Sequence, residues 1–219
     1  MPPSSHEHEH EHEPRFFPSR LYPIVDTLGD PKRSHVDLAQ AMLAAGAPLL
    51  QLRAKELPTR PFVEIARALK ALTDGARAQL IINDRADIAL LIDAAGVHLG
   101  QDDLPPTAAR QILGPSRIIG FSTHNLQQAE AAARAGVADY IGFGPIYSTT
   151  SKQRPDPVQG LEGLRAARSR VALPIVAIGG ITAATMPEVL AAGADAVAMI
   201  GAIVRAADVE ATVRSLLQH

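Results

Sequence analysis

Short apolar runs alternate with alanine-rich helical stretches along the chain from Leu21 onward, and this alternation is the strongest constraint on the fold. The runs are rich in leucine and β-branched residues, which favour strands. Strands are expected at Leu21–Val25, Leu49–Arg53, Leu80–Asn83, Gly96–Leu99, Ile118–Phe121, Tyr140–Phe143, Ile175–Ile178 and Ala196–Met199. Helical patterns between them include Val36–Ala45, Pro61–Thr73, Leu126–Ala135 and Thr185–Ala192. Strands separated by helices need crossover connections, which produce a parallel sheet.

The near-even spacing of these units predicts an α/β fold of one particular kind, a single (β/α)₈ TIM barrel. Eight strand–helix units in about 200 residues is the usual size of such a barrel. The alternative is a doubly wound open sheet, which would be favoured by a glycine-rich dinucleotide-binding turn after the first strand. The segment Asp26–Asp30 is not such a turn.

The first part of the chain differs in composition from the rest. Residues 1–18 contain Pro, Ser and an alternating run of His and Glu from His6 to Glu13, without apolar periodicity. This composition predicts a disordered tail or a tag, although alternating His and Glu could also bind a transition metal weakly. The expected domains are therefore a tail over 1–18 and a catalytic barrel over 19–219.

Charge and composition limit the classes of partner. A net charge of -2, no Trp and 4% aromatic residues argue against a nucleic-acid surface. No apolar run approaches the roughly 18 residues of a membrane span, and no secretory signal is visible. The chain has no cysteine, which excludes thiolate chemistry and fits a reducing cytoplasm. We expect a cytoplasmic enzyme that acts on small molecules; its sequence is also compatible with a homo-oligomer.

Polar residues follow the second strand, at the end where barrel enzymes place their chemistry. The segment reads Gln51-Leu52-Arg53-Ala54-Lys55. Alternation puts Gln51, Arg53 and, if the strand extends so far, Lys55 on one face. Two cations and an amide at a barrel mouth predict an anion site, with an exposed basic patch as the alternative.

Acidic residues follow the third and fourth strands. Asp84 comes after Asn83, and Asp102-Asp103 follows the segment His98–Gln101. Two carboxylates beside an anion site predict Mg²⁺ held by Asp84 and Asp103, because Mg²⁺ prefers oxygen ligands and substrate phosphates. The alternatives are that these aspartates cap helices or begin turns.

Further candidates follow the later strands. Ser122 and His124 come after the fifth strand, where His124 could be a general base or a hydrogen-bonded structural residue, and Asn125 is an expected helix N-cap. A hydroxyl-rich loop runs from Gly144 to Lys152 and could close over a phosphate. Glycines at 179–180 and 201 follow the last two strands, where barrels often bind phosphate; tight turns are the alternative reason for them.

With these residues in view, the chain resembles the thiamine-phosphate synthase family from about Leu21 to its end. The resemblance is carried by QLRAK at 51–55, INDRADIAL at 82–90, GVHLGQDDLP at 96–105, GFSTHN at 120–125, GFGPIYSTTSK at 142–152 and AIGGI at 177–181. The six motifs come in family order and each lies at an expected strand end. AIGGI alone is less specific, because many phosphate-binding barrels have a similar segment.

The resemblance implies a role for each site residue. A hydroxymethylpyrimidine diphosphate would be bound by Gln51, Arg53, Lys55, Asn83, Ser122 and Lys152, and a thiazole phosphate by Thr149, Thr150, Ser151, Gly180, Ile200 and Gly201. Asp84 and Asp103 would carry Mg²⁺. The family usually has a Thr-Pro-Thr-Lys-like run where this chain has Thr149-Thr150-Ser151-Lys152, and it often has Ser in place of Gly201.

The activity implied is Mg²⁺-assisted transfer of the pyrimidinylmethyl group to the thiazole, giving thiamine phosphate and diphosphate. Arg53, Lys55, Ser122 and Lys152 would be the catalytic residues. A thiazole tautomerase of the same superfamily, using His124, would leave the cationic and acidic residues unexplained. A non-catalytic phosphate-binding barrel is a further alternative, since fold does not dictate function.

Overall fold

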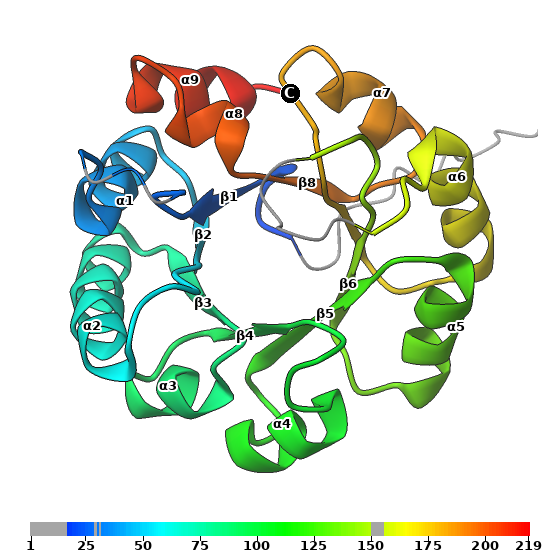
Figure 1. Cartoon of the computed structure of the whole chain (residues 1–219), viewed down its shortest axis with the longest axis horizontal. Coiled ribbons are helices and arrows are strands. Elements are labelled where there is room, and N and C mark those ends of the chain that lie inside the picture. Colours follow the sequence, from blue (N-terminus) through cyan, green and yellow to red (C-terminus); the bar gives the residue numbers. More distant parts are fainter. Residues whose placement is uncertain (1–16, 29, 31, 150–155) are drawn as a thin grey trace, which may run out of the picture.

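The computed structural model describes residues 17–28, 30, 32–149 and 156–219. Its strands form a closed barrel in the order β1-β2-β3-β4-β5-β6-β7-β8, and every neighbouring pair, including β8 with β1, is parallel. Helices surround this barrel on the outside (Figure 1). The expected (β/α)₈ barrel is confirmed, and the open doubly wound sheet is excluded.

The strands lie close to their expected positions. Their bounds are β1 Leu21–Val25, β2 Leu49–Leu52, β3 Gln79–Asn83, β4 Gly96–Leu99, β5 Ile118–Thr123, β6 Tyr140–Phe143, β7 Ile175–Ala177 and β8 Ala196–Met199. Four strands match the sequence-based bounds, and the others differ by one or two residues at an end, as hydrogen-bond definitions of strand ends commonly do. For example, β2 stops at Leu52, although the Arg53 N–H still donates to the Val25 carbonyl at 2.9 Å.

The first seven helices connect successive strands, the last two follow β8, and the helices pack on the outer face of the barrel (Figure 1). They are α1 His35–Ala44, α2 Thr59–Ala76, α3 Ala86–Leu91, α4 Pro106–Leu113, α5 Leu126–Ala135, α6 Gly160–Arg170, α7 Met186–Ala191, α8 Gly201–Val204 and α9 Val209–Leu216. The local sequence explains several of these starts, since the Ser34, Asn125 and Asp208 side chains accept backbone N–H bonds as N-caps. The expected N-cap at Asn125 is confirmed.

Alternation along each strand divides the buried residues into two groups. In β1, Leu21 and Val25 face the helices, whereas Tyr22 and Ile24 belong to a smaller cluster inside the barrel. The outer group is almost wholly aliphatic and holds the helices on the sheet. The inner group contains tyrosine hydroxyls, so polar chemistry can extend from the strand ends down into the barrel.

The packed domain begins earlier than the sequence suggested. Phe17, which falls within the expected tail, is 5% exposed, and its ring centroid lies 5.0 Å from that of Tyr140 and 5.8 Å from that of Tyr22. A boundary at residue 18 therefore cuts off a core residue. The His/Glu run at 6–13 lies outside the described residues. Within the described ranges, no helix combines the length and the apolar character needed to cross a membrane.

Candidate active site

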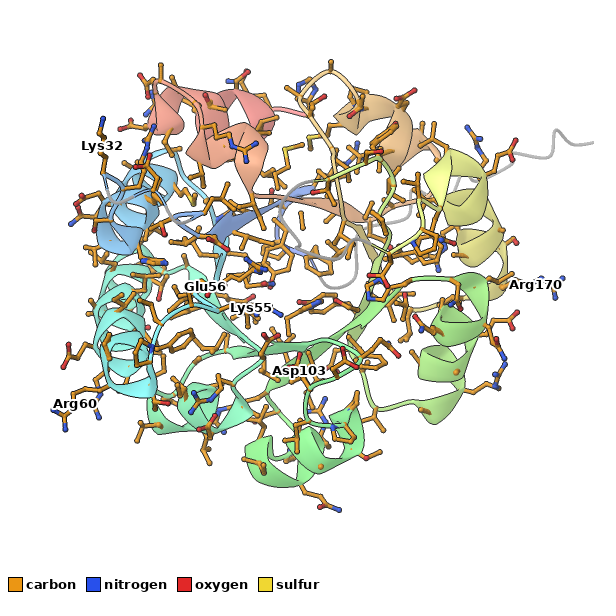
Figure 2. All side chains as sticks on the ribbon, in the orientation of Figure 1. Lys32, Lys55, Glu56, Arg60, Asp103 and Arg170 are labelled. Carbon is orange, nitrogen blue, oxygen red and sulfur yellow. The ribbon has the colours of Figure 1, made fainter. Side chains whose placement is uncertain are left out.

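A pocket of about 740 Å³ opens at the carboxyl ends of the strands. Its size is typical of a site for small organic ligands. Figure 2 shows Lys55 and Asp103 directed toward the centre of the barrel, whereas Lys32, Arg60 and Arg170 point outward into solvent. The charged side chains at the barrel mouth are therefore distinct from those on the outer surface.

Most of the residues predicted for the site line this one pocket. They are Gln51, Arg53, Lys55, Asn83, Asp84, Asp103, Ser122, Thr149, Gly180, Ile200 and Gly201. Thr150, Ser151 and Lys152 lie outside the described residues. The structure thus brings together side chains from both halves of the chain, as expected of a barrel mouth.

The residues after β2 reach the pocket by different routes. Gln51 is 3% exposed and points into the barrel, while Arg53 pairs with the buried Asp26 carboxylate. Asp26 also accepts the Leu28 N–H at 2.7 Å, which fixes the carboxylate in place. Lys55 lies beyond the end of the strand, yet its ammonium lines the same pocket. This arrangement is not an exposed basic patch, because Arg53 is paired with the buried Asp26 carboxylate.

The two aspartates of the predicted metal site are neighbours. Burial raises the pKa of Asp84 to about 6, and the adjacent Asp103 carboxyl acts in the same direction, opposed by Lys55 at 3.0 Å. Asp84 does not cap α3, whose N-cap is Arg85, and α4 begins after Pro105. The helix-cap alternatives are therefore wrong. Asp103 does hold its own loop, because its Oδ2 accepts the Gly100 N–H at 2.7 Å.

The backbone helps to direct Asp84 into the pocket. Its φ is 65°, in the left-handed region that non-glycine residues adopt uncommonly. The Asp84 N–H donates to the His98 carbonyl at 2.8 Å, which secures this conformation against the neighbouring strand. Strained backbone of this kind concentrates at functional positions.

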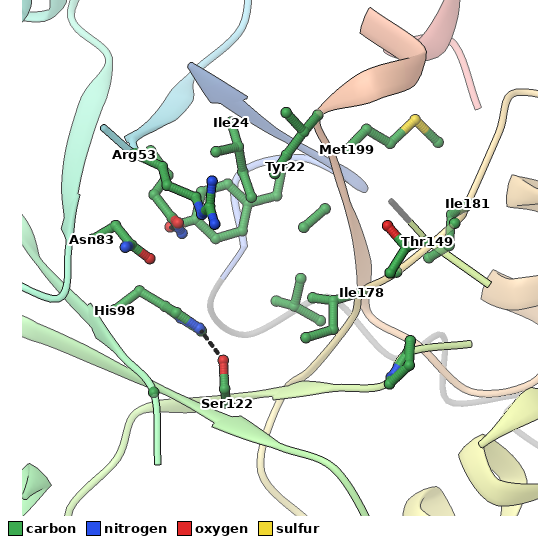
Figure 3. Close-up of a pocket in the computed structure, with 18 of the residues that line it drawn as sticks. Tyr22, Ile24, Arg53, Asn83, His98, Ser122, Thr149, Ile178, Ile181 and Met199 are labelled. Atoms are coloured by element: carbon green, nitrogen blue, oxygen red, sulfur yellow. Dashed lines mark hydrogen bonds between the residues drawn. The ribbon is translucent and has the colours of Figure 1, made fainter. Parts of the chain in front are cut away.

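Ser122, at the end of β5, is held by a histidine that the sequence analysis did not select. The His98 Nε2 and Ser122 Oγ atoms are 2.9 Å apart, and this contact joins the neighbouring strands β4 and β5 (Figure 3). Burial lowers the pKa of His98 to about 4. His98 is therefore neutral at neutral pH and is no candidate for a cationic anion-binding group.

His124 is engaged with the backbone of the next loop. Its Nδ1 lies 3.0 Å from the Gly144 carbonyl, which can only accept, so Nδ1 carries a hydrogen and donates it. This is the contact expected of a structural histidine, one of the two interpretations considered from the sequence. The ring also borders the pocket.

The far side of the pocket is built from the segments after β6, β7 and β8. Gly180 has a φ of 69°, and a Cβ there would come within 2.5 Å of the Ser148 carbonyl oxygen, so glycine allows the two loops to touch. Thr149, Gly201 and the exposed Arg205 line the same side. The Arg205 Nη1 atom lies 3.4 Å from where a Cβ of residue 201 would stand. These groups suit a second anion.

Comparison with known proteins agrees with this geometry. A family model described as thiamine monophosphate synthase matches residues 21–203. The chain belongs to the thiamine monophosphate synthase family. The match covers all the predicted site residues, including those outside the described ranges.

Proteins that carry this family name match the chain over nearly their full length. Thiamine-phosphate synthase of Chloroflexus aurantiacus is 47% identical over 90% of this chain and 90% of the relative, and that of Moorella thermoacetica is 47% identical over 90% and 93%. A solved thiamine phosphate pyrophosphorylase from Pyrococcus furiosus superposes with a TM-score of 0.81 at 39% identity, covering 91% of this chain and 94% of that one. The family expected from the motifs is confirmed.

Several residues of this thiamine monophosphate synthase family member were missed by sequence reasoning. His98 could have been found, because it is polar at an inward-facing position of an otherwise apolar strand. Tyr22 gave the same signal in β1. Asp26 was considered only within the segment Asp26–Asp30, as evidence against a dinucleotide-binding turn. Arg205 directly follows the short helix α8, where nothing in the local pattern marks it.

Proposed function

We propose that this pocket couples 4-amino-2-methyl-5-(diphosphooxymethyl)pyrimidine to 4-methyl-5-(2-phosphoethyl)thiazole, or its carboxylate, with the aid of Mg²⁺. The products are thiamine phosphate and diphosphate, and the enzyme is a transferase of the pyrimidinylmethyl group. Family membership and the names of the relatives support the reaction. The assignment of each residue to one substrate follows the family motifs, and those of these residues that the structure describes line one pocket.

One observation carries the proposal: the cations Arg53 and Lys55 line the same pocket as the adjacent carboxyls of Asp84 and Asp103. A phosphate site alone would need only the cations. An acid pair beside them suits a diphosphate that enters with a divalent cation, because Asp84 and Asp103 would hold the cation and the cation would offset the charge of the phosphate oxygens.

The two aspartates fit Mg²⁺ by the nature of their donor atoms. Both carboxyls meet at the pocket, where burial, and after it the neighbouring Asp103, raise the pKa of Asp84. Mg²⁺ commonly takes one or two carboxylates and completes its shell with water and phosphate oxygens. When bound, Mg²⁺ would neutralise negative charge on the leaving diphosphate.

The cationic residues complete the diphosphate site. Asp26 holds the Arg53 guanidinium in place, so the arginine is preorganised to donate to phosphate oxygens. Lys55 is a mobile point charge at the rim, with its side chain 48% exposed. Lys152 is assigned here from its family motif, as a further donor to the diphosphate. Gln51, Asn83 and Ser122 would contact the pyrimidine part.

The opposite side of the pocket is assigned to the thiazole phosphate. Thr149, Gly180, Ile200 and Gly201 line it, and Thr150 and Ser151 are assigned to it by their motif. The amides at the start of α8 have no partner within the helix and can donate to a phosphate oxygen. In this proposal the two substrates lie on facing walls of one cavity.

The reaction requires no side-chain nucleophile. The bond between the methylene carbon and the diphosphate oxygen breaks, and its electron pair leaves with the diphosphate. The electron-rich aminopyrimidine delocalises the resulting charge until the thiazole nitrogen forms the new bond to carbon. Arg53, Lys55 and Lys152 stabilise the negative charge that grows on the leaving group. No proton transfer is needed to balance the step.

The reaction is assigned to the cytoplasm. A chain without cysteine and without an apolar segment of membrane-spanning length suits that compartment. Fractionation of cells that express the full chain would test the location.

A coupling assay with both substrates tests the proposal. We expect thiamine phosphate and diphosphate to appear in equal amounts with Mg²⁺ and to stop when EDTA is added. If folded protein makes neither product and instead isomerises the thiazole carboxylate, the tautomerase alternative is correct. Turnover that is unaffected by EDTA would refute the metal assignment alone.

A further inference from the structure

A chain of hydrogen bonds between mostly buried side chains runs along the floor of the pocket and ends at Ser122. The Gln51 Nε2 atom lies 3.0 Å from the Tyr22 hydroxyl, which lies 3.2 Å from the Tyr140 hydroxyl. Tyr140 is 2.8 Å from His98 Nδ1, and His98 Nε2 is 2.9 Å from Ser122 Oγ. Four of these five residues are buried, and Ser122 borders the pocket. Figure 3 shows His98 and Ser122 facing each other at its end.

The strands make room for this chain with two glycines. A Cβ on Gly120 would stand 2.3 Å from the Tyr140 hydroxyl and 2.5 Å from His98 Nδ1, the two atoms that form the central hydrogen bond. A Cβ on Gly142 would stand 3.2 Å from His98 Cε1. Glycine weakens a strand interior and commonly marks the close approach of another group. The absence of a side chain at Gly120 therefore leaves room for the contact between Tyr140 and His98.

Counting hydrogens gives the chain a direction. Gln51 donates to the Tyr22 hydroxyl. Among these contacts, both buried tyrosine hydrogens find an acceptor only when Tyr22 donates to Tyr140 and Tyr140 donates to His98 Nδ1. Nδ1 is then an acceptor, and the single hydrogen of the neutral ring is on Nε2, where it is donated to Ser122 Oγ. The Ser122 oxygen receives that hydrogen and keeps its own O–H for the pocket.

The surroundings of His98 keep the ring in its neutral form. The His98 side chain is buried inside the barrel, where a charged ring is disfavoured. A neutral ring has one hydrogen and one lone pair, so its orientation and tautomer decide what Ser122 can offer. The Tyr140 ring stacks on the imidazole, with centroids 5.4 Å apart, and fixes that orientation.

We propose that His98 is a positioning residue: Tyr140 holds it as the Nε2–H tautomer, and His98 thereby makes Ser122 a hydrogen-bond donor toward the pocket. Ser122 would then bind a lone pair of the ligand, such as an oxygen of the leaving diphosphate or a ring nitrogen, rather than an amino group. The ligand follows from the proposed function, whereas the tautomer is a property of the free protein.

Nitrogen NMR of the free protein tests the tautomer without any substrate. Long-range ¹H–¹⁵N spectra of the full ¹⁵N-labelled chain at pH 7 should show His98 with a protonated Nε2 and an unprotonated Nδ1. The signals of His98 are identified by their loss in His98→Gln. An Nδ1–H tautomer, or a doubly protonated ring, would overturn the proposal.

Removing one hydroxyl tests the link through Tyr140 while His98 stays in place. In Tyr140→Phe, we expect an Nδ1–H population of His98 to appear and kcat to fall about 10-fold, the effect of one lost polar interaction. The matched control is Tyr147→Phe, which removes a tyrosine hydroxyl that bonds to Glu188 outside this chain and should leave the His98 spectrum unchanged. An unchanged tautomer and turnover in Tyr140→Phe would contradict the proposal.

A double-mutant cycle separates positioning from general structural support. Ser122→Ala and His98→Leu should each lower kcat by about 10- to 100-fold, and the double variant should lose little more than either. His98→Gln, which can still offer an N–H, should recover part of the loss with little change in KM for the thiazole phosphate. Additive losses in folded variants would refute the proposal. Failure of the wild-type coupling assay would instead refute the proposed function and leave the tautomer result valid.

Discussion

The Lys55 ammonium lies 3.0 Å from Oδ2 of Asp84, on the carboxyl that also adjoins Asp103. The lysine thus offsets part of the charge of an acid pair that is assigned here to a metal. Binding of a divalent cation would relieve the same repulsion more completely. Lys55 would then be available to the diphosphate, which needs a cation at the rim of the pocket.

Removal of either acid should therefore weaken the use of Mg²⁺. We expect Asp84→Asn and Asp103→Asn each to lower kcat/KM at least about 100-fold, because charge stabilisation of the leaving group is lost. The Mg²⁺ concentration for half-maximal activity should also rise. Titration of activity with MgCl₂ measures both effects. Asp87→Asn, an exposed acid on α3 paired with Arg85, is the control and should behave as wild type.

Arg205 should act on one substrate only. It lines the wall of the pocket that is assigned to the thiazole phosphate, close to Gly201. We expect Arg205→Ala to raise KM for the thiazole phosphate about 10-fold, the value of a charged hydrogen bond at a partly exposed site. KM for the pyrimidine diphosphate should stay within about twofold of wild type. Equal changes in the two KM values would mean that Arg205 does not act on the thiazole phosphate alone. The control for surface charge is Arg214→Ala on α9.

Folding stability should depend on His98 at mildly acidic pH. The pKa of His98 is about 4 in the folded protein, compared with its ordinary value of 6.5, which applies in the unfolded chain. Between these pH values the unfolded chain therefore binds more protons than the folded protein. Stability is therefore present above about pH 6.5 and is lost as the pH falls toward 4, by up to about 3 kcal/mol. Urea unfolding of wild type and His98→Gln at several pH values should show a steeper loss in the wild type. Parallel curves would contradict the low pKa.

Two glycine-to-alanine changes should have opposite effects. Gly120→Ala would force a methyl group within 2.1 Å of Tyr140 Cζ, and overpacking of this kind typically costs about 1–3 kcal/mol. Gly75→Ala, in the exposed last turn of α2 with no atom within 4 Å of the new Cβ, should stabilise by about 0.5–1 kcal/mol. Thermal unfolding compares the pair. A neutral Gly120→Ala would show that the strands can shift to admit the methyl group.

The barrel could be predicted because its signal repeats. Each strand is a short apolar run, as Tyr140–Phe143 is, and each helix shows a helical spacing of apolar residues. An error in the bounds of one element therefore leaves the order of the elements unchanged. The errors lie at ends where no side chain marks the stop, as where β5 continues to Thr123. Phe17 was missed because its apolar partners come from distant strands, which sequence proximity does not show.

The site was predictable where chemistry coincides with a strand end. Gln51, Arg53 and Asn83 directly follow apolar residues, and the parallel barrel brings such positions to one mouth. His98 was missed because a single polar residue inside a strand is usually structural, and its role depends on Tyr140 from another strand. Arg205 follows α8, whose four residues are too few to show a helical period in the sequence. The roles of Thr150, Ser151 and Lys152 stay predictions.

The packing of Phe17 under Tyr22 and Tyr140 has a practical consequence. Phe17 precedes β1, so the chain enters at the amino end of the barrel, opposite the mouth that holds Lys55 and Asp103. An immobilisation matrix or fusion partner attached directly ahead of this residue is thus joined to the face opposite the pocket. Trimming the chain past Phe17 would instead remove part of the barrel floor.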